Sequence, residues 1–205
     1  MKFCSHCATP VEVKTPEGDN RPRFVCPGCD TIFYQNPRIV AGTLPVYRNG
    51  DLHQILLCKR AIEPRKGYWT LPAGFMENGE STVQAAERET LEEANARVIS
   101  QSAFTMISVP HINQVHLFYL ADLPEPEFSS GSESLEVALF DEKDIPWKEI
   151  AFPTVARTLK HYFANQHDPQ ELQRCASSVI ELDQALKKLE EEEKQRYKSA
   201  NRQTS

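Results

Sequence analysis

Most of the chain before residue 168 alternates between short apolar runs and clusters of turn-forming residues. Runs of this length that are rich in β-branched and aromatic side chains predict strands. Two short runs flank a turn-rich tip at residues 14–22, and five longer runs follow it. The predicted strands are residues 10–14, 23–25, 39–47, 54–60, 103–109, 114–121 and 136–141.

In two segments the pattern of the chain is that of an α-helix instead. Ser81 is a favourable N-cap for a helix over residues 81–94, and Asn95 stands where a left-handed residue would end that helix. A second helix is predicted over residues 154–165, directly after Pro153. Its apolar face consists of Val155, Leu159 and Tyr162.

After residue 168 the apolar positions are three and four residues apart, which is typical of a narrow stripe along one helix. These positions are Leu172, Cys175, Val179, Leu182, Leu186 and Leu189. The pattern predicts a C-terminal amphipathic helix that covers an apolar patch of its own domain. The alternative is a dimerising helix, and a mass that stays monomeric at every concentration would exclude such a homodimer.

The order of these elements predicts an α+β protein with three parts. A small module covers residues 1–36, the main domain covers 37–167, and the helix with a frayed tail covers 168–205. The chain has 205 residues and a net charge of −6, which argues against nucleic acid or an anionic membrane as a partner. No apolar stretch is long enough to span a bilayer and no apolar leader follows Met1, so we expect a cytoplasmic protein.

Two C-x-x-C pairs lie in the small N-terminal module. They consist of Cys4, Cys7, Cys26 and Cys29. Because a chain without a secretion signal rarely forms disulfides, the pairs indicate a four-cysteine zinc ribbon. About 35 residues cannot build an adequate core, so bound Zn²⁺ would stabilise the module. Four thiolates leave no open coordination position, which makes this zinc structural rather than catalytic.

The main candidate for chemistry is the helix that begins at Ser81. Glu89, Glu92 and Glu93 are spaced i, i+3 and i+4, so their carboxylates share one face. Crowded carboxylates repel each other unless a cation binds there, and hard oxygen ligands favour Mg²⁺ or Mn²⁺, which usually carry phosphate oxygens as well. For three glutamates alone, a solvated acidic face with an Arg88–Glu92 ion pair is the better explanation. The small residues of the loop at 71–79 favour the metal site, because they allow a substrate to approach closely.

This region resembles the Nudix box, G-x5-E-x7-R-E-U-x-E-E-x-G-U, in which U is a bulky apolar residue. The matching run is Gly74-x5-Glu80-x7-Arg88-Glu89-x2-Glu92-Glu93. The resemblance implies a Nudix α/β/α sandwich with a mixed sheet. Three positions depart from the pattern, namely Thr90, Asn95 and Ala96, and none of them removes a metal ligand. Asn tolerates the left-handed conformation, so the turn at Asn95 is expected to survive.

The resemblance also implies roles for individual residues. The catalytic cation would be bound by Glu89, Glu92, Glu93 and the backbone carbonyl of Ala73, with Glu80 and Arg88 as support. Arg60 stands where some family members contact substrate phosphate, although a surface charge explains it equally well. Glu133 and Glu136 are candidate general bases, and an ordinary polar loop is an equally good explanation of both. Trp69 and Phe75 are candidates to stack on a base of the substrate, and burial in the core is the alternative.

The span from Phe3 to Phe163 is similar to a zinc-ribbon group of Nudix hydrolases that includes plant chloroplast FAD diphosphatases. The shared runs are the cysteine pairs and residues 34–37, 57–60, 69–74 and 133–136. The resemblance implies hydrolysis of FAD to FMN and AMP, or of ADP-ribose to AMP and ribose 5-phosphate. Residues 105–121 lack the Ser-Gln-Pro-Trp-Pro-Phe-Pro run of the NADH pyrophosphatases, which makes NADH a weaker candidate.

Three other hypotheses remain open at this point. The chain could be a non-catalytic regulator that senses a nucleotide, although such a protein has no need of three crowded carboxylates. It could instead be a hydrolase of damaged nucleoside triphosphates. A panel of triphosphates and dinucleotides would distinguish this activity from hydrolysis of FAD or ADP-ribose. It could also be a scaffold that recruits partners through its C-terminal helix.

Overall fold

The structure is a computed structural model of the chain, and the residues described are 1–50 and 52–181. The chain divides into two compact units, Met1–Pro37 and the part that begins at Arg38. Within the described ranges, no helix is both long and apolar enough to cross a membrane.

The first unit is a small antiparallel sheet with two cysteine turns beside it. Its strands are β1 (Glu12–Lys14), β2 (Arg23–Val25) and β3 (Ile32–Phe33), in the order β1-β2-β3. The third strand has only two residues, which is too short for an apolar pattern to reveal it. Apart from Val25, the buried apolar residues of this unit are Cys4 and Cys26. The unit therefore has almost no core of its own apart from its cysteines.

The second unit is built on one mixed sheet, in which the described strands follow the order β10-β5-β4-β9-β8-β11. The central pair β4 and β9 is parallel, whereas β9 pairs with β8 and β4 pairs with β5 in antiparallel fashion. The strands are β4 (Arg38–Asn49), β5 (Leu52–Arg60), β8 (Ile99–Val109), β9 (Gln114–Asp122), β10 (Ser134–Phe140) and β11 (Ala176–Val179).

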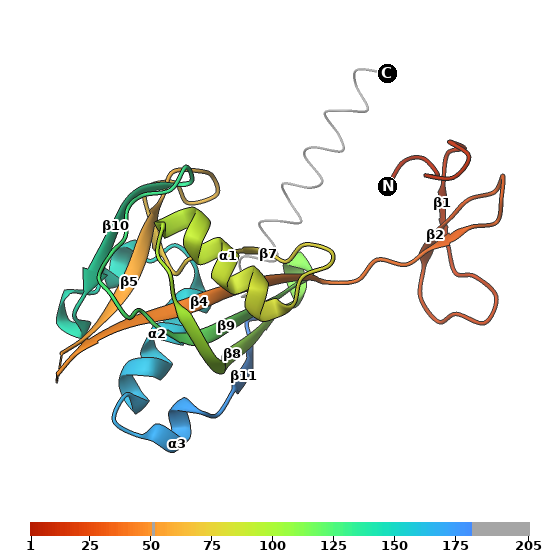
Figure 1. Ribbon diagram of the computed structural model, residues 1–205. Helices are drawn as coiled ribbons and strands as arrows, with labels where there is room; N and C mark the ends of the chain where they lie inside the picture. Colours follow the sequence, from red (N-terminus) through yellow and green to blue (C-terminus); the bar gives the residue numbers. More distant parts are fainter. Residues whose placement is uncertain (51, 182–205) are drawn as a thin grey trace. The chain divides into compact units, whose positions relative to one another are not determined.

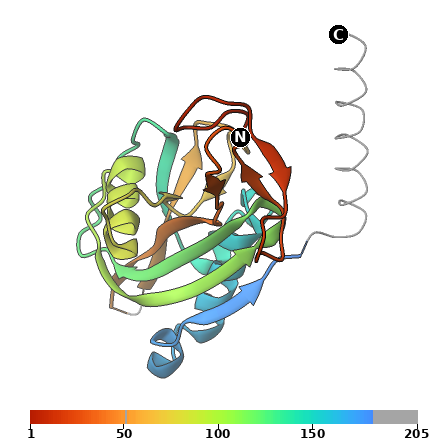
Figure 2. The same cartoon turned by 90° about the vertical axis from the view of Figure 1, so that its right-hand side faces the viewer.

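Two helices cover opposite faces of this sheet, α1 (Thr82–Ala94) and α2 (Pro153–Asn165) (Figures 1 and 2). Successive side chains of a strand point to opposite faces, so Ala41 of β4 packs beneath α1 whereas Leu44 joins the core beneath α2. Short 3₁₀ turns lie in the connections at Pro110–Ile112, Glu142–Asp144 and Trp147–Glu149. The predicted α+β sandwich with a mixed sheet is confirmed.

The segment before α1 is part of the sheet rather than the free loop that the sequence indicated. Its two short strands are β6 (Trp69–Thr70), which pairs with β5, and β7 (Ala73–Phe75), which pairs with β4. Pairing between β4 and β5 is confined to the end of β4 at Val46–Asn49. Strand β7 takes the place of β5 beside Val40–Gly42. The two strands therefore diverge, and the loop that enters α1 lies between them.

The prediction of one helix along the C-terminal stripe is wrong for its first part. A single helical turn, α3 (Pro169–Leu172), is followed by strand β11. Ala176 pairs with Thr105 and Val179 with Ser108, in parallel along the outer edge of β8. The segment pairs with unpaired backbone groups on that edge, and its two serines and Val179 are weak helix formers. The remaining stripe positions, Leu182, Leu186 and Leu189, lie outside the described residues.

Candidate functional site

Both ends of α1 are fixed by the residues that the sequence singled out. Ser81 and Gln84 form a capping box: the Gln84 N–H donates to Ser81 Oγ at 3.2 Å, and the Ser81 N–H donates to Gln84 Oε1 at 2.8 Å. Asn95 has φ 48° and donates its backbone N–H to the Leu91 carbonyl. These caps define the rotation of the helix and therefore the direction in which its glutamates point.

Arg88 ties the acidic side chains of this region together. Its Nε and Nη2 form a bidentate pair with Glu80 at 3.0 and 2.8 Å. Its Nη1 lies 2.7 Å from Glu89 Oε1 and 3.3 Å from Glu92 Oε2, and Nη2 also donates to the Phe75 carbonyl. The hydrogen bonds from Arg88 lower the pKa of Glu80 to about 2, so Glu80 stays ionised as a fixed counter-charge.

Glu93 and Glu89 are partly or wholly removed from water, unlike an ordinary acidic helix face. Glu93 is 6% exposed, and its Oε2 has no hydrogen-bond partner among the described residues. Burial raises the pKa of Glu93 to about 8, with a contribution from the charge of Glu89, although a backbone hydrogen bond from Ala73 opposes the shift. Burial also raises the pKa of Glu89. A buried carboxylate with a free oxygen is costly unless a cation neutralises it.

Gly74 allows the loop before α1 to lie directly against Glu89. A Cβ at Gly74 would stand 2.3 Å from Cδ of Glu89, so any other residue would displace the carboxylate. The free Glu93 oxygen and this close fit suit a hard cation such as Mg²⁺ or Mn²⁺. Among the described residues, the four cysteines are the one group of three or more potential ligands whose atoms gather closely, within 4.8 Å of one another. The three carboxylates do not converge in the same way.

A cavity of about 770 Å³ opens beside the carboxylates. Glu89, Glu92 and Glu93 line one part of it. Of the other residues that the sequence nominated, the cavity brings together Arg60, Ala73, Phe75, Arg88 and Glu133. The Arg60 Nε donates to the Pro64 carbonyl at 2.9 Å, and its guanidinium lies over the Phe152 ring at 5.1 Å. Phe75 remains 45% exposed, and the Arg38 guanidinium lies over its ring at 4.4 Å.

Glu80 supports the site from outside the cavity lining through Arg88, and two other nominated residues lie elsewhere. Trp69 is 5% exposed and belongs to the core, where its ring meets Phe140 edge to face at 4.8 Å. Glu136 points away from the cavity lining and forms an ion pair with Lys59 at 3.5 Å. Trp69 follows the general tendency of large aromatic residues to be buried. Glu133 ends the loop before β10, whereas Glu136 lies on β10 beyond a shift in the strand register and is paired with Lys59 of β5.

The loop that leads to Glu133 docks on the end of α1, which the sequence patterns did not predict. A Cβ at Gly131 would stand 1.7 Å from the Glu92 carbonyl oxygen, and the Gly131 N–H donates to the Glu93 carbonyl at 3.0 Å. The Asn95 side chain donates to Ser129 Oγ at 3.0 Å. Asn95 therefore both ends the helix and holds the loop. Its departure from the family glycine was the only available signal.

The cysteine cluster lies in the first unit. The Sγ atoms of Cys7 and Cys26 are 3.4 Å apart, and that of Cys29 lies 3.6 Å from Cys7 and 3.7 Å from Cys4. A tetrahedral zinc with Zn–S bonds of about 2.3 Å requires sulfur separations of about 3.8 Å. All four cysteines are free of disulfides. A hydrogen bond with Thr9 lowers the pKa of Cys7 to about 6, whereas burial raises the pKa of Cys26 to about 11, so Cys7 is the more readily ionised of this pair. The four sulfurs therefore fit Zn²⁺.

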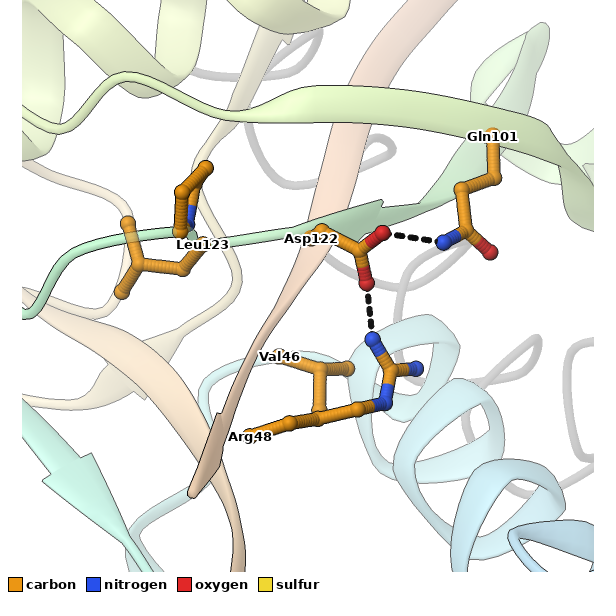
Figure 3. Close-up of a pocket in the computed structure, with 6 residues that line it drawn as sticks. Val46, Arg48, Gln101, Asp122 and Leu123 are labelled. Atoms are coloured by element: carbon orange, nitrogen blue, oxygen red, sulfur yellow. Dashed lines mark hydrogen bonds and ion pairs between the residues drawn. The ribbon is translucent and has the colours of Figure 1, made fainter. Parts of the chain in front are cut away.

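A second hollow, of about 480 Å³, lies near the ends of β4 and β9. Asp122 bridges Arg48 and Gln101 across it (Figure 3). Because these polar groups already bind one another, the hollow offers little to a ligand.

Comparison with known proteins gives consistent matches. The zinc-ribbon family described as Nudix N-terminal matches residues 2–35, and the NUDIX domain matches residues 36–200. Among curated proteins, the chain is similar to the NAD-capped RNA hydrolase NudC of Chromobacterium violaceum, with 27% identity over 78% of this chain and 57% of that protein. The NudC protein of Haemophilus influenzae is 30% identical over 78% of this chain and 59% of its own length. The chain thus spans less than two thirds of the length of these relatives.

Solved structures give the same result. A NUDIX hydrolase from Nitrosomonas europaea is 49% identical, with a TM-score of 0.81, and the match covers 88% of this chain and all of that one. An Ap4A hydrolase from C. elegans is 22% identical with a TM-score of 0.53, over 63% of this chain and 98% of that one. At that lower identity the likeness shows the fold alone.

Proposed function

Because this chain belongs to the Nudix hydrolase family, we propose that it hydrolyses the diphosphate bridge of a dinucleotide-type substrate with the help of Mg²⁺ or Mn²⁺. The substrates that we favour are FAD, which would give FMN and AMP, and ADP-ribose, which would give AMP and ribose 5-phosphate. This choice follows the resemblance of the cysteine pairs and of residues 34–37, 57–60, 69–74 and 133–136 to the FAD diphosphatase group.

One observation carries the proposal. A single cavity of about 770 Å³ joins the carboxylates of α1 to apolar walls that include Val40, Phe75 and Ile112. This volume is within the range of sites that enclose small ligands. A dinucleotide substrate needs a cation-binding site for its charged diphosphate and an apolar surface for its base, next to each other. A purely solvated acidic face would have no enclosed space beside it.

Each group of residues in the cavity has its own role in the proposed reaction. Glu89, Glu92 and Glu93 would hold the cation, which supplies charge neutralisation of the diphosphate and an activated water. Arg88 is a positioning residue, because its bonds to Glu89 and Glu92 hold both carboxylates on the cavity side.

Two further side chains act on the reacting groups in this proposal. Glu133 lines the cavity and lies near enough to raise the pKa of Glu89 and Glu93 by its charge. It is therefore the favoured group to accept a proton from the attacking water, whereas Glu136 is directed elsewhere. Arg60 would contact a substrate phosphate, since its guanidinium reaches the same cavity.

The cysteine cluster has a separate role in the proposal. Cys4, Cys7, Cys26 and Cys29 would hold one structural Zn²⁺, which stabilises a unit that has very few buried apolar residues.

A second candidate substrate class is favoured by the curated relatives. The proteins from Chromobacterium violaceum and Haemophilus influenzae are named NAD-capped RNA hydrolases. NADH or an NAD-type cap therefore belongs in any substrate test, even though the chain lacks the proline-rich run that the NADH pyrophosphatases carry.

The test is product analysis after incubation of the protein with Mg²⁺ and, in parallel, FAD, ADP-ribose, NADH and a nucleoside triphosphate. We expect FMN and AMP from FAD, or AMP and ribose 5-phosphate from ADP-ribose, and no product with Glu92→Gln. Preferential cleavage of NADH would select the second candidate. Cleavage of none of the four by folded, zinc-loaded protein would contradict hydrolysis and favour a nucleotide sensor.

A further inference from the structure

Three polar side chains form a hydrogen-bonded chain in the wall of the cavity. Gln114 and His116 lie on β9, and both line the cavity. His116 Nε2 is 2.9 Å from Gln114 Oε1, and His116 Nδ1 is 3.1 Å from Oγ1 of Thr154, which is 3% exposed in α2. The sheet and the helix that covers it are therefore linked through one imidazole ring at the edge of the site.

The atoms in these contacts determine where the protons are. Gln114 Oε1 can only accept, so His116 Nε2 must carry the proton that lies between them. Nδ1 of the neutral ring then accepts from the Thr154 hydroxyl. Burial lowers the pKa of His116 to about 4, so the ring stays neutral at neutral pH. The Gln114 amide is thereby held in one orientation, and both hydrogens of its NH₂ group remain for another partner.

Strand register places this amide near the exposed Phe75 ring. Val40 of β4 is paired with Phe75 of β7 on one side and with His116 of β9 on the other. Paired residues of neighbouring strands point to the same face, and so do residues two apart on one strand. Arg38 of β4 is paired with Gln114, and its guanidinium lies over the Phe75 ring at 4.4 Å. Together with Arg38, these residues form one surface that combines an aromatic ring, an aliphatic side chain, a guanidinium and a fixed amide donor.

We infer that Gln114 reads the edge of a heterocyclic base by donating its NH₂ hydrogens to a ring-nitrogen or carbonyl acceptor, and that His116 and Thr154 are positioning residues that hold the amide for this task. This inference rests on the proposed function, because it concerns the base of the same substrate. Adenine and isoalloxazine both carry such acceptors. The chemistry is common to both, and the experiment below decides which of them lies at Gln114.

The experiment measures equilibrium binding by calorimetry with AMP, FMN and ribose 5-phosphate, in Mg²⁺, for the full chain. Binding of these monophosphates does not depend on hydrolysis. Gln114→Leu should weaken binding of AMP or of FMN on the order of tenfold, the typical size of one lost hydrogen bond. Ribose 5-phosphate has no base, so its binding should stay unchanged. Gln101→Leu is the matched control, because Gln101 lies on β8 at the second hollow and contacts Asp122.

A pair of variants tests the positioning role of His116. In His116→Gln the new amide nitrogen can reach the place of Nε2 and still donate to Gln114. In His116→Asn the amide reaches only the place of Nδ1 and Gln114 loses its anchor. We expect His116→Gln to keep most of the affinity for the base and His116→Asn to lose it, with equal affinity of the two variants for ribose 5-phosphate. A merely structural role of His116 would not separate the two variants in this way.

Several outcomes would overturn the inference. They are unchanged binding of both AMP and FMN in Gln114→Leu, an equal loss for ribose 5-phosphate, and wild-type protein that binds neither AMP nor FMN. A wild-type protein that binds one of these bases through Gln114 but cleaves no dinucleotide would leave base recognition intact and remove only the hydrolase proposal. The two failures are therefore distinguishable.

Discussion

The four cysteines and the three glutamates are both candidate metal ligands, and the chain holds them in different ways. In the first unit all four sulfur ligands lie within 4.8 Å of one another and are already arranged around a common point. On α1, Arg88 binds Glu89 and Glu92, whereas Glu93 is buried with a free oxygen. The cysteine cluster is complete without help from a ligand. The carboxylate cluster is held open toward a cavity.

The difference reflects what each unit has to stabilise its fold. The first unit has very few buried apolar residues, so convergence of its candidate metal ligands on an ion would supply stability that its core lacks. The second unit has a large core on both faces of its sheet, so it can hold carboxylates in an unfavourable arrangement that a cation and substrate would relieve. Comparing metal-ligand variants in the two units therefore separates a metal that maintains structure from one that takes part in chemistry.

The largest effect is expected from Cys26→Ser. Cys26 is completely buried in the cluster, and structural zinc contributes about 10 to 16 kcal/mol to folding in small zinc-finger peptides. The variant should lose one equivalent of zinc and become sensitive to protease within the first unit. Metal content and limited proteolysis provide the measurement. Cys175→Ser, at an exposed cysteine outside the cluster, should behave like the wild type. Unchanged zinc content in Cys26→Ser would refute the four-cysteine site.

Glu93→Gln tests the carboxylate cluster, and we expect it to reduce activity without affecting the fold. It replaces a buried carboxylate of the site by a neutral group of the same shape, so hydrolysis should fall on the order of a thousandfold, as when one charge-stabilising group is removed from an active site. Circular dichroism and zinc content should be unchanged. Glu136→Gln is the control, since that glutamate contacts Lys59 outside the cavity. Full activity in Glu93→Gln would exclude it as a cation ligand.

The free energy of unfolding of the second unit should fall as pH rises, and an added cation should diminish this fall. Because the pKa of Glu93 is raised to about 8 in the fold, the folded state binds more protons than the unfolded state between pH 4.5 and 8. The contribution of the Glu93 carboxyl to the free energy of unfolding is therefore complete below pH 4.5 and is lost as pH rises through 8. The loss between pH 5 and pH 8 should be roughly 3 kcal/mol.

Urea unfolding at pH 5, 6.5 and 8 in Mg²⁺-free buffer measures this loss. Added Mg²⁺ should diminish it, because the cation binds the ionised form of the folded state, and Glu93→Gln should flatten the same profile. A wild-type profile identical to that of the variant would contradict the pKa shift.

The smallest effect concerns the support of α1 on the sheet. Thr90 replaces a bulky apolar residue of the family pattern, and its hydroxyl lies 2.7 Å from that of Thr43 with both residues fully buried. Thr90→Val leaves Thr43 without this partner and should cost about 1 to 2 kcal/mol of unfolding free energy. The double variant Thr43→Val with Thr90→Val should recover most of the loss in urea unfolding. Additive losses would show that the two hydroxyls do not act as a pair.

The sequence by itself determined the local elements and the candidate ligand sets. The helix over 81–94 follows from Ser81, the i, i+3, i+4 glutamates and Asn95, and the cysteine spacing alone indicated the cluster. These features depend on residues close together in the chain, so their periods and caps can be read directly. The Nudix resemblance added the fold, because its box spans the loop and the helix together.

Only the tertiary structure decided which of the remaining residues share the cavity. Glu133 and Glu136 are equivalent in the sequence, but Glu133 ends the loop before β10 and lines the cavity, whereas Glu136 lies on β10 and forms an ion pair with Lys59. Trp69 and Phe75 are both candidates to stack on a base, but Phe75 is exposed in the fold whereas Trp69 is buried in the core. The C-terminal stripe has the period of a helix, yet Ala176–Val179 pairs with the open edge of β8. In each case the outcome depends on contacts between segments far apart in the chain, which no local period encodes.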